Sequence, residues 1–432
     1  MSILSLALVT ALASGCGGRP RPQRAFPVGD AIVSVGSREG LTVVLSRPRS
    51  VAESARAAAE WTHELSGELQ PYGDGGLGLE GDLVFVRIGA AEGTRVAALE
   101  RSTGQARWLG SPWTAAVEHA PPLALAVGPT RVLDLAYEAT GVRALVHDRA
   151  TGARTAEVEL DRDLVVKRVA ALGDGFVVIG ASRAQVVRGD GSLGPAVSTR
   201  GDICVEGASA RGLGRRGLVT LHERGEPAEA PIADLAGSVV ACGRLQSGLF
   251  VFLVDHAAEA RWEVVLLAPD TGVLSRFGGP GNLDEPALRR IVALGPDASP
   301  WRGRLPAVLP LIVADGEGSR PVRVDLEARS VEPLATVHAR WKLAGVTRLG
   351  SGHAVVVGRW MVALDGAGAV QHAVRVDRGV VGPPVSDGAG LAWVDGDGNV
   401  NAVHGSGFAG PPGTDATPAL DEAMRELGLN RE

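Results

Sequence analysis

Two of the three cysteines in this chain could react with each other. Cys204 and Cys242 each lie in a run of apolar, strand-forming residues, and they occupy similar places in successive units of the sequence. They would either oxidise to a disulfide or remain as two buried free thiols, and a disulfide requires Cα atoms within about 7 Å. The sequence does not show that separation, so both alternatives stay open.

The third cysteine follows a segment typical of an export signal. Residues 3–13 are apolar but too few for a membrane-spanning helix, which needs roughly 20 residues. Residues 12–16, Leu-Ala-Ser-Gly-Cys, resemble the bacterial lipobox, although the leucine sits one place early and no lysine or arginine precedes the apolar run. The resemblance implies a lipoprotein signal peptide over residues 1–15 and lipidation of Cys16. Gly17, in place of aspartate, favours the outer membrane.

Two alternatives to a lipoprotein signal remain, namely an ordinary cleaved signal peptide and a buried first strand. An address outside the cytoplasm would permit oxidation of Cys204 and Cys242. Residues 16–28 are short, basic and rich in proline, which predicts a semi-extended tether between the lipid and the folded body.

Two further motifs match a functional pattern only in part. Residues 212–217 spell G-x-G-x-x-G, but a helix must follow this phosphate-binding fingerprint and residues 218–221 have a strand pattern. We interpret them as a glycine-rich turn between strands. Residues 395–399 alternate oxygen ligands as in a calcium loop, yet Val400 and Ser406 stand where glycine and an acid are needed. An Asp-Gly hairpin turn is the preferred interpretation.

Other catalytic or metal-binding patterns do not occur in the sequence. It contains neither the nucleophile elbow G-x-S-x-G nor the zinc motif H-E-x-x-H, and none of the nine histidines has metal-ligand spacing. His147 and Asp148 are neighbours in a strand pattern, so their side chains alternate across the strand rather than converge. The same holds for His63 and Glu64. We therefore predict a protein that is not an enzyme, with no catalytic residue, metal or cofactor.

The composition favours many short strands. The chain has 432 residues, 45% of them hydrophobic, with 59 glycines and 26 prolines but only 4% aromatic residues. Abundant turn formers suit short strands joined by turns better than a few large helices. The formal net charge of −6 argues against a nucleic-acid binder, which usually carries a basic face.

A repeat organises the elements that would position these residues. Residues 94–108 comprise an extended run, a Thr-Gly turn and a second run that ends on tryptophan, and turn signals recur at intervals of roughly 40 residues, a period typical of propeller blades. The residues of this signature are Leu99, Thr103, Gly104, Trp108, Thr151, Gly152, Thr271 and Gly272.

Strands that are short and adjacent in sequence indicate antiparallel meanders. Because a ring of such sheets removes exposed edges, we predict an all-β fold, a single β-propeller of four-stranded antiparallel blades over residues 29–408. We expect eight blades, with seven as the alternative. A hairpin over residues 30–46 and a truncated last unit should complement each other and latch the ring. Residues 50–65 favour a short helix, although Trp61 onward also resembles the end of a blade.

The tail, residues 409–432, is expected to carry a short helix between Thr417 as N-cap and Gly428. Its apolar side would consist of Leu420, Ala423, Met424 and Leu427. Such a helix packs on its own domain or hangs free more often than it recruits a partner.

The pattern from Leu99 through Thr103 and Gly104 to Trp108 resembles the repeat of PQQ-like propellers, the quinoprotein dehydrogenase-like superfamily. Other copies are degenerate, with Ala156 and Arg276 at the tryptophan position. The resemblance implies a propeller whose tryptophans pack between neighbouring sheets. Its enzymes hold pyrroloquinoline quinone and calcium and commonly have a disulfide between adjacent cysteines, whereas no two cysteines are adjacent here.

Address, length and repeat type together also resemble the BamB family of outer-membrane assembly lipoproteins. This implies a lipid-anchored, non-enzymatic scaffold that binds a protein partner in the bacterial envelope, with the lipid as its contact to the membrane and no role in nucleic-acid binding. The alternative is a periplasmic enzyme or small-ligand sensor with a site on the propeller axis. No partner-binding residue can be assigned from the sequence.

Overall fold

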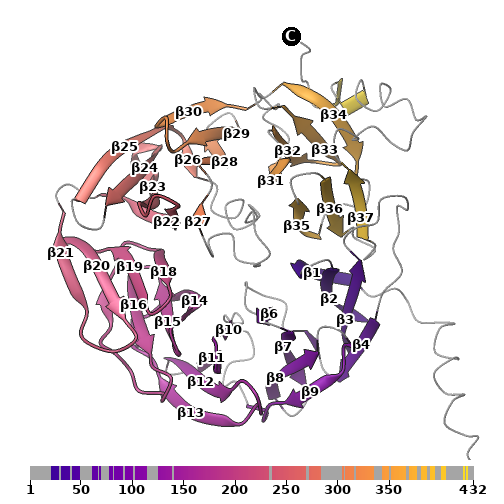
Figure 1. The fold of residues 1–432 in the computed structure, drawn as a ribbon, viewed down its shortest axis with the longest axis vertical. Helices are drawn as coiled ribbons and strands as arrows, with labels where there is room; N and C mark the ends of the chain where they lie inside the picture. The colour runs from indigo at the N-terminus through magenta and orange to yellow at the C-terminus, as the bar shows by residue number, and fades with distance from the viewer. Residues whose placement is uncertain are drawn as a thin grey trace, which may run out of the picture.

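A computed structural model shows the chain as a ring of sheets (Figure 1). It describes residues 21–426 with gaps at 29–30, 39–40, 49–60, 67, 70–76, 81, 91–92, 101–102, 114–124, 139–140, 233–235, 269–271, 284–303, 306, 316–317, 335–342, 350–351, 366–368, 377–380, 387–389, 395–399, 405–421 and 424. Across these described residues there are nine sheets, which we number in chain order. The prediction of an all-β propeller is confirmed.

The first three sheets contain β1 (Arg21–Val28), β2 (Ala31–Arg38), β3 (Leu41–Pro48) and β4 (Trp61–Ser66); then β5 (Glu68–Leu69), β6 (Leu77–Glu80), β7 (Leu83–Ala90), β8 (Gly93–Glu100) and β9 (Ala106–Leu109); then β10 (Ala126–Val127), β11 (Arg131–Glu138), β12 (Gly141–Asp148) and β13 (Arg154–Glu159).

The next three sheets contain β14 (Val166–Leu172), β15 (Gly175–Gly180), β16 (Arg183–Val187) and β17 (Val197–Ser198); then β18 (Ile203–Glu206), β19 (Ser209–Leu213), β20 (Gly217–His222) and β21 (Ala228–Pro231); then β22 (Ser238–Leu245), β23 (Phe250–His256), β24 (Arg261–Ala268), β25 (Gly272–Pro280) and β27 (Arg304–Leu305), with the 3₁₀ turn η1 (Ala257–Glu259) before β24.

The last three sheets contain β26 (Asn282–Leu283), β28 (Val308–Asp315), β29 (Gly318–Asp325) and β30 (Ser330–Pro333); then β31 (Leu343–Leu349), β32 (Gly352–Val357), β33 (Trp360–Leu364) and β34 (Val370–Arg375); then β35 (Val381–Ser386), β36 (Gly390–Val394) and β37 (Val400–His404).

Each sheet is an antiparallel meander that runs outward from the axis of the ring (Figure 1). In the third sheet, for example, β11 and β12 pair from Arg131 opposite Asp148 to Glu138 opposite Gly141. The pairing departs from this pattern in three sheets. In the second, β5 and β6 both pair with β7, and in the seventh β26 pairs with β28. In the sixth, β27 lies parallel to β22 on the inner side. Chain-adjacent pairing of this kind confirms the predicted meanders.

The core lies between neighbouring sheets, and the middle strands contribute to it on both faces. In β15, Phe176 and Val178 pack toward the third sheet, whereas Val177 and Ile179 pack toward the fifth. Strand β23 behaves likewise. Its residues 250, 252 and 254 pack toward the fifth sheet, and residues 251 and 253 pack toward the seventh. Because side chains alternate across a strand, a strand buried on both faces needs a continuous apolar run.

The first and last sheets are neighbours, because β1 lies against β35 and β36. The expected hairpin is present as β2 and β3, but β1 and β4 complete it to a sheet of four strands. Hairpin and last unit therefore lie side by side as two sheets instead of sharing one. This explains why the described residues form nine sheets where the sequence predicted eight or seven.

The ring also begins earlier than predicted. Residues 21–28, assigned to the tether, form β1, whose register with β2 shifts between Pro22 and Arg24. Proline is tolerated there because β1 is the edge strand of its sheet, so one side of its backbone needs no hydrogen-bond partner within that sheet. Of residues 50–65, predicted as a helix or, from Trp61 onward, as the end of a blade, the part from Trp61 is the strand β4, and residues 50–60 lie outside the described residues.

The tail packs on its own domain, one of the two arrangements that the sequence favoured over binding to a partner. Residues 422–423 and 425–426 are helical. Ala423 is buried in one cluster with Trp360 and Val362 of the eighth sheet. The carboxylate of Glu426 accepts hydrogen bonds from Arg359 Nε at 3.0 Å and from Trp360 Nε1 at 2.8 Å. Leu420, Met424 and Leu427 lie outside the described residues.

Candidate functional site

The tryptophan of the repeat signature joins two sheets. Trp108, at 8% exposure, lies in β9, the outer strand of the second sheet. Its indole Nε1 donates to the carbonyl oxygen of Arg149 in the third sheet at 2.9 Å, and its ring lies 5.9 Å from that of Phe85. The signature tryptophan therefore packs between neighbouring sheets, as the resemblance to PQQ-like propellers implied.

The Thr-Gly turn of the third sheet is shaped to receive that indole. Gly152 has φ +73°, and a Cβ on it would lie 2.5 Å from the Trp108 ring. The Thr151 hydroxyl and the Gly152 amide hold the turn by donating to Asp148, to Oδ1 at 2.9 Å and to the carbonyl oxygen at 2.8 Å. The hydrogen bond from Thr151 lowers the pKa of Asp148.

The other signature residues are also turn and core positions. Leu99 is fully buried, and Gly104 has φ +70° with its amide donating to the Glu100 carbonyl at 2.7 Å. The Thr103 hydroxyl donates to the carboxylate of Glu100 at 3.2 Å. Gly272 begins β25 with φ +88°, and Thr271 lies outside the described residues.

A buried ion pair between the second and third sheets was not predicted. Arg87 Nε of β7 lies 3.0 Å from Asp134 Oδ1 of β11, and the two side chains are 4% and 0% exposed. Arg87 Nη2 also donates to the Leu135 carbonyl at 3.1 Å, and Trp113 Nε1 donates to the other oxygen of Asp134 at 2.8 Å. The available signal was a lone acid inside the apolar run of β11, because a charge buried on both faces needs a partner.

His147 is buried in the same region, in β12. Its Nδ1 lies 3.3 Å from the Gly152 carbonyl oxygen. Burial lowers the pKa of His147, and this outweighs the opposing effect of Asp134. Asp148, next along the strand, is half-buried and holds the Thr-Gly turn. His147 thus contacts the Gly152 carbonyl oxygen and Asp148 accepts from the Thr151 hydroxyl, so both side chains contact the Thr-Gly turn.

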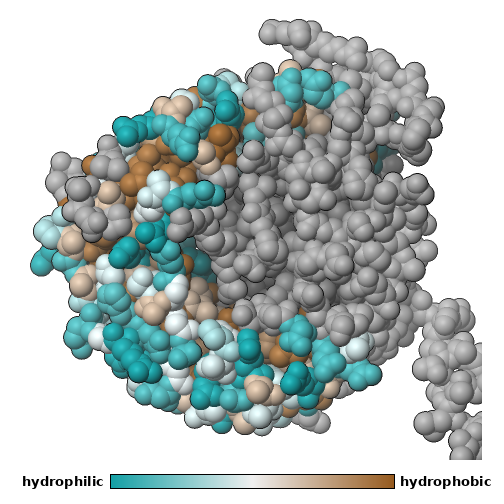
Figure 2. Space-filling model, in the orientation of Figure 1, coloured by the Kyte–Doolittle hydropathy of each residue, from teal (hydrophilic) through white to brown (hydrophobic). Residues whose placement is uncertain are grey.

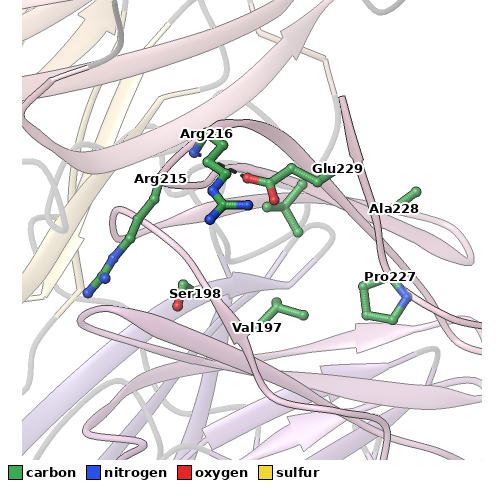
Figure 3. Close-up of a pocket in the computed structure, with 8 residues that line it drawn as sticks. Val197, Ser198, Arg215, Arg216, Pro227, Ala228 and Glu229 are labelled. Carbon is green, nitrogen blue, oxygen red and sulfur yellow. Dashed lines mark hydrogen bonds between the residues drawn. The ribbon is translucent and has the colours of Figure 1, made fainter. Parts of the chain in front are cut away.

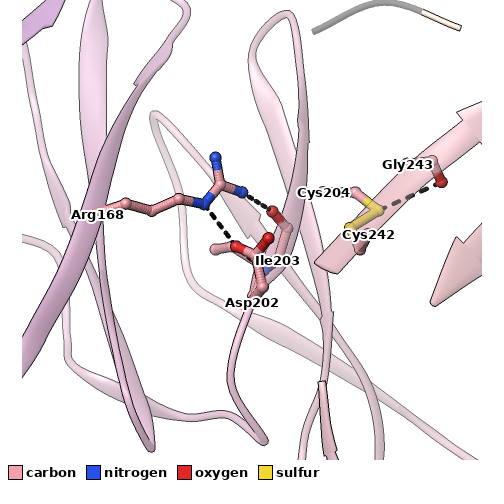
Figure 4. Close-up of a disulfide and its surroundings, with 6 residues drawn as sticks. All are labelled: Arg168, Asp202, Ile203, Cys204, Cys242 and Gly243. Atoms are coloured by element: carbon pink, nitrogen blue, oxygen red, sulfur yellow. Dashed lines mark hydrogen bonds and ion pairs between the residues drawn. A yellow bond between two sulfur atoms is a disulfide. The ribbon is translucent and has the colours of Figure 1, made fainter. Parts of the chain in front are cut away.

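A disulfide joins Cys204 and Cys242, the alternative that the sequence left open (Figure 4). Their Cα atoms are 5.3 Å apart, and the bond links β18 to β22. Both are the first strands of their meanders, so the bond clamps the fifth and sixth sheets at the inner side of the ring (Figure 1).

A second joint binds the fourth sheet to the fifth beside this disulfide (Figure 4). Arg168 Nε of β14 donates to Asp202 Oδ1 at 2.5 Å, and its Nη2 donates to the Ile203 carbonyl oxygen at 2.6 Å. A charge-assisted contact of this kind is among the stronger hydrogen bonds in proteins. The inner strands β14, β18 and β22 are thus linked in series by side chains.

The G-x-G-x-x-G motif is the turn between β19 and β20, as interpreted from the sequence. The Gly214 amide donates to the Gly217 carbonyl oxygen at 2.7 Å, and no helix follows. The turn borders a hollow of about 370 Å³ between the fourth and fifth sheets (Figure 3). Residues that line it are Val197, Ser198, Arg215, Arg216, Val219, Pro227, Ala228 and Glu229.

Two predicted sites lie outside the described residues, namely the lipidation site Cys16 and the turn at residues 395–399. Within the described part of the chain, no group of three or more histidine, cysteine, aspartate or glutamate side chains could hold a metal ion. The same part contains no helix that is both long and apolar enough to span a membrane.

Comparisons with known proteins show a distant likeness to other propellers. No family model matches the chain, and no curated protein matches it. Among solved structures, BamB from Moraxella catarrhalis is 13% identical over 90% of this chain and 97% of its own, with a TM-score of 0.44. AztD from Citrobacter koseri, in its apo form, is 13% identical over 89% of this chain and 98% of its own, with a TM-score of 0.45.

A europium-containing methanol dehydrogenase is 12% identical over 90% of this chain and 84% of its own, with a TM-score of 0.48. Identities this low and TM-scores below 0.5 transfer no activity, ligand or partner to this chain. The propeller assignment rests on the chain's own sheets and their order round the ring.

Proposed function

We propose that this protein is a lipid-anchored, non-enzymatic propeller that binds a protein partner in the envelope of a Gram-negative bacterium. The observation that carries the proposal is the two-sided burial of the sheets. Because the faces of middle strands such as β15 and β23 are used up against neighbouring sheets, recognition is left to turns, connecting loops and outer strands. Loops displayed on a rigid scaffold are a common arrangement for binding.

The cysteines support an address outside the cytoplasm. The disulfide between Cys204 and Cys242 fits an oxidising compartment such as the periplasm, and the lipobox-like residues 12–16 supply a route to it. We propose acylation of Cys16 and retention at the outer membrane. The sequence resemblance to the BamB family suggests outer-membrane protein assembly as the process that the scaffold serves.

The polar residues buried between sheets support a structural use of the ring. Arg87 and Asp134 neutralise each other, and Trp108 and Arg168 bond backbone carbonyls of the next sheet. Each of these contacts joins neighbouring sheets. They give these polar groups a structural role that does not require a reaction.

The test is capture of the acylated protein from detergent-solubilised envelope. We expect the wild-type chain to bring down an envelope protein at near-stoichiometric yield, and mass spectrometry of the mature chain to find a lipid-modified cysteine at position 16. A Cys16→Ser variant is the matched control and should remain unacylated. Absence of any stoichiometric envelope partner would count against the scaffold, and a thermal shift of several degrees on adding calcium and pyrroloquinoline quinone would favour a ligand site on the axis.

A further inference from the structure

The hollow beside the G-x-G-x-x-G turn carries two arginines on a fixed turn. A Cβ on Gly217 would lie 1.9 Å from the Ala230 carbonyl oxygen, so the backbone of β21 packs directly against this residue. The bond between Gly214 and Gly217 closes the turn. The residues between these glycines, Arg215 and Arg216, are therefore exposed at a constant place above the hollow (Figure 3).

Neither guanidinium has an ion-pair partner in the part of the chain that the structure describes. Partly exposed arginines of the third and fourth sheets do have one, for example Arg154 with Glu157 at 3.1 Å and Arg183 with Asp161 at 3.0 Å. Glu229 lines the same hollow, but its Oε1 accepts the backbone N–H of Arg216 at 3.2 Å. The hollow thus has two guanidinium groups and one carboxylate, which leaves positive charge suited to a planar carboxylate.

The walls of the hollow suit an extended chain. On one side lies β17, and on the other lies β21, whose four residues are all exposed. Both are the outermost strands of their sheets, so each has one edge without a partner strand in that sheet. A peptide can add a strand to such an edge, with main-chain hydrogen bonds giving affinity and alternate side chains giving specificity. The apolar side chains of Val197, Val219 and Pro227 provide contacts for those side chains.

The local charge and the strand edges together indicate the class of partner. Two guanidinium groups favour carboxylates, and the open edges of β17 and β21 accept main-chain hydrogen bonds, which a polypeptide offers and a nucleic acid or a lipid headgroup does not. The rim of the ring around these sheets mixes hydrophilic and apolar residues (Figure 2). We propose that this hollow binds an extended acidic segment of a partner polypeptide, with Arg215 and Arg216 on its carboxylates; the inference rests on the proposed scaffold function.

The test measures binding of a fluorescein-labelled heptapeptide of alternating valine and glutamate by fluorescence anisotropy, using the purified full-length chain. We expect saturable binding by the wild type, at least tenfold weaker binding by R215Q/R216Q, and little binding of the matched valine–glutamine peptide. E229Q should bind the acidic peptide about threefold more tightly, because it removes the opposing charge and keeps an oxygen to accept the Arg216 N–H.

The matched control is R162Q/R224Q, which removes two arginines that are 76% and 85% exposed and do not line the hollow. It should bind like the wild type, and circular dichroism should show that all variants are folded. The inference is overturned if the wild type does not bind, if the control loses as much affinity as R215Q/R216Q, or if E229Q binds more weakly. Arginine-dependent binding to phosphatidylglycerol vesicles, or displacement by millimolar inorganic phosphate, would overturn the assignment to a polypeptide.

Partner capture separates this inference from the proposed function. If R215Q/R216Q captures the envelope partner as well as the wild type does, the hollow is not its binding site and the scaffold function stands. If the wild type captures no partner, the scaffold function fails, and the peptide measurement still decides whether the hollow binds acidic segments.

Discussion

At the scale of single residues, polar side chains join the sheets of this ring. Trp108, Arg168 and the pair of Arg87 and Asp134 each reach from one sheet to the next. Buried polar groups cost free energy unless they are hydrogen-bonded, so each joint favours one arrangement of its two sheets over any other. Glycines matter where such a side chain meets a turn, and Gly152 is the clearest case.

Substituting Gly152 by alanine should destabilise the protein. The substitution forces a left-handed conformation on alanine, at a cost of about 1 kcal/mol, and also drives a methyl group into the Trp108 ring, at a further 1–3 kcal/mol or so. The control is G207A, where φ is +54° and a Cβ would meet nothing within 4 Å. Urea unfolding should show a clearly larger loss for G152A, and equal losses would contradict the steric explanation.

His147 should make stability depend on pH near neutrality. Burial lowers its pKa below the ordinary 6.5, so as pH falls below 6.5 the unfolded chain binds a proton that the folded chain does not. The contribution of His147 to the free energy of unfolding is therefore fully present above pH 6.5 and is lost as the solution is acidified. Urea unfolding between pH 7.5 and pH 5 should show a weaker dependence in H147Q. The exposed-site control H222Q should follow the wild type, and identical slopes for all three would refute the prediction.

At the scale of elements, two contacts join parts of the fold that strand pairing does not join, namely the disulfide and the contact of the tail helix with the eighth sheet. The disulfide fixes inner strands β18 and β22, whereas the tail helix is held by β33 and the turn before it. Neither contact belongs to the hydrogen-bonded sheets, so each can be removed while the meanders keep their pairing. Their separate contributions to stability are measurable.

Removal of the disulfide should lower the free energy of unfolding by about 4 kcal/mol. The bond closes a sequence separation of 38 residues, and the loss of entropy in the unfolded chain scales with the logarithm of that length. The measurement is urea unfolding of the wild type with and without reductant, beside C204S/C242S. Reductant should destabilise the wild type and leave the serine variant unchanged. A wild type that is insensitive to reductant would contradict the prediction.

The contact of the tail helix should be lost in acid. Hydrogen bonds from Arg359 and Trp360 lower the pKa of Glu426 from 4.5 to about 2, so its stabilisation is complete above pH 4.5 and disappears as pH falls toward 2. Hydrogen exchange of residues 422–426 should be slower in the wild type than in E426Q at pH 7, with the difference vanishing near pH 2. E422Q is the control, since Glu422 makes a longer contact, 3.4 Å, with Arg375. A difference that persists unchanged at pH 2 would refute the mechanism.

The sequence predicted strands and turns correctly where a single physical cause explains the residue pattern. Runs such as Phe176 to Ile179 are continuous because both faces of the strand are buried, and Thr-Gly turns recur because a left-handed residue must follow the strand. The tether prediction was wrong at β1, since proline there indicates an edge strand as readily as a linker. The pairing of Asp134 with Arg87 depends on which sheets become neighbours, which is a property of the ring and not of the local pattern.

At the scale of the whole molecule, the contact between the first and last sheets determines whether every sheet has a neighbour on both faces. Each apolar face needs a neighbour, and the contact of β1 with β35 and β36 gives one to both ends of the array. Without it, the sheets at both ends of the array would each lack a neighbour, and apolar surface exposed to water costs roughly 25 cal/mol for each Å². The ring is therefore expected to unfold as one cooperative unit, since opening it at any joint exposes the faces on both sides.

Deleting the first sheet tests this cooperativity. A chain that lacks residues 1–66 loses β1 to β4 and with them the neighbour of β35, so both ends of the remaining array expose apolar surface. We expect it to bind a hydrophobic dye and to unfold at a lower urea concentration with a broadened transition. A chain that lacks only residues 1–20 is the control, because it keeps all nine sheets of the described residues and should match the full-length protein. If the two truncated chains shared one sharp transition at the same midpoint, the first sheet would be dispensable and ring closure would not be the source of the cooperativity.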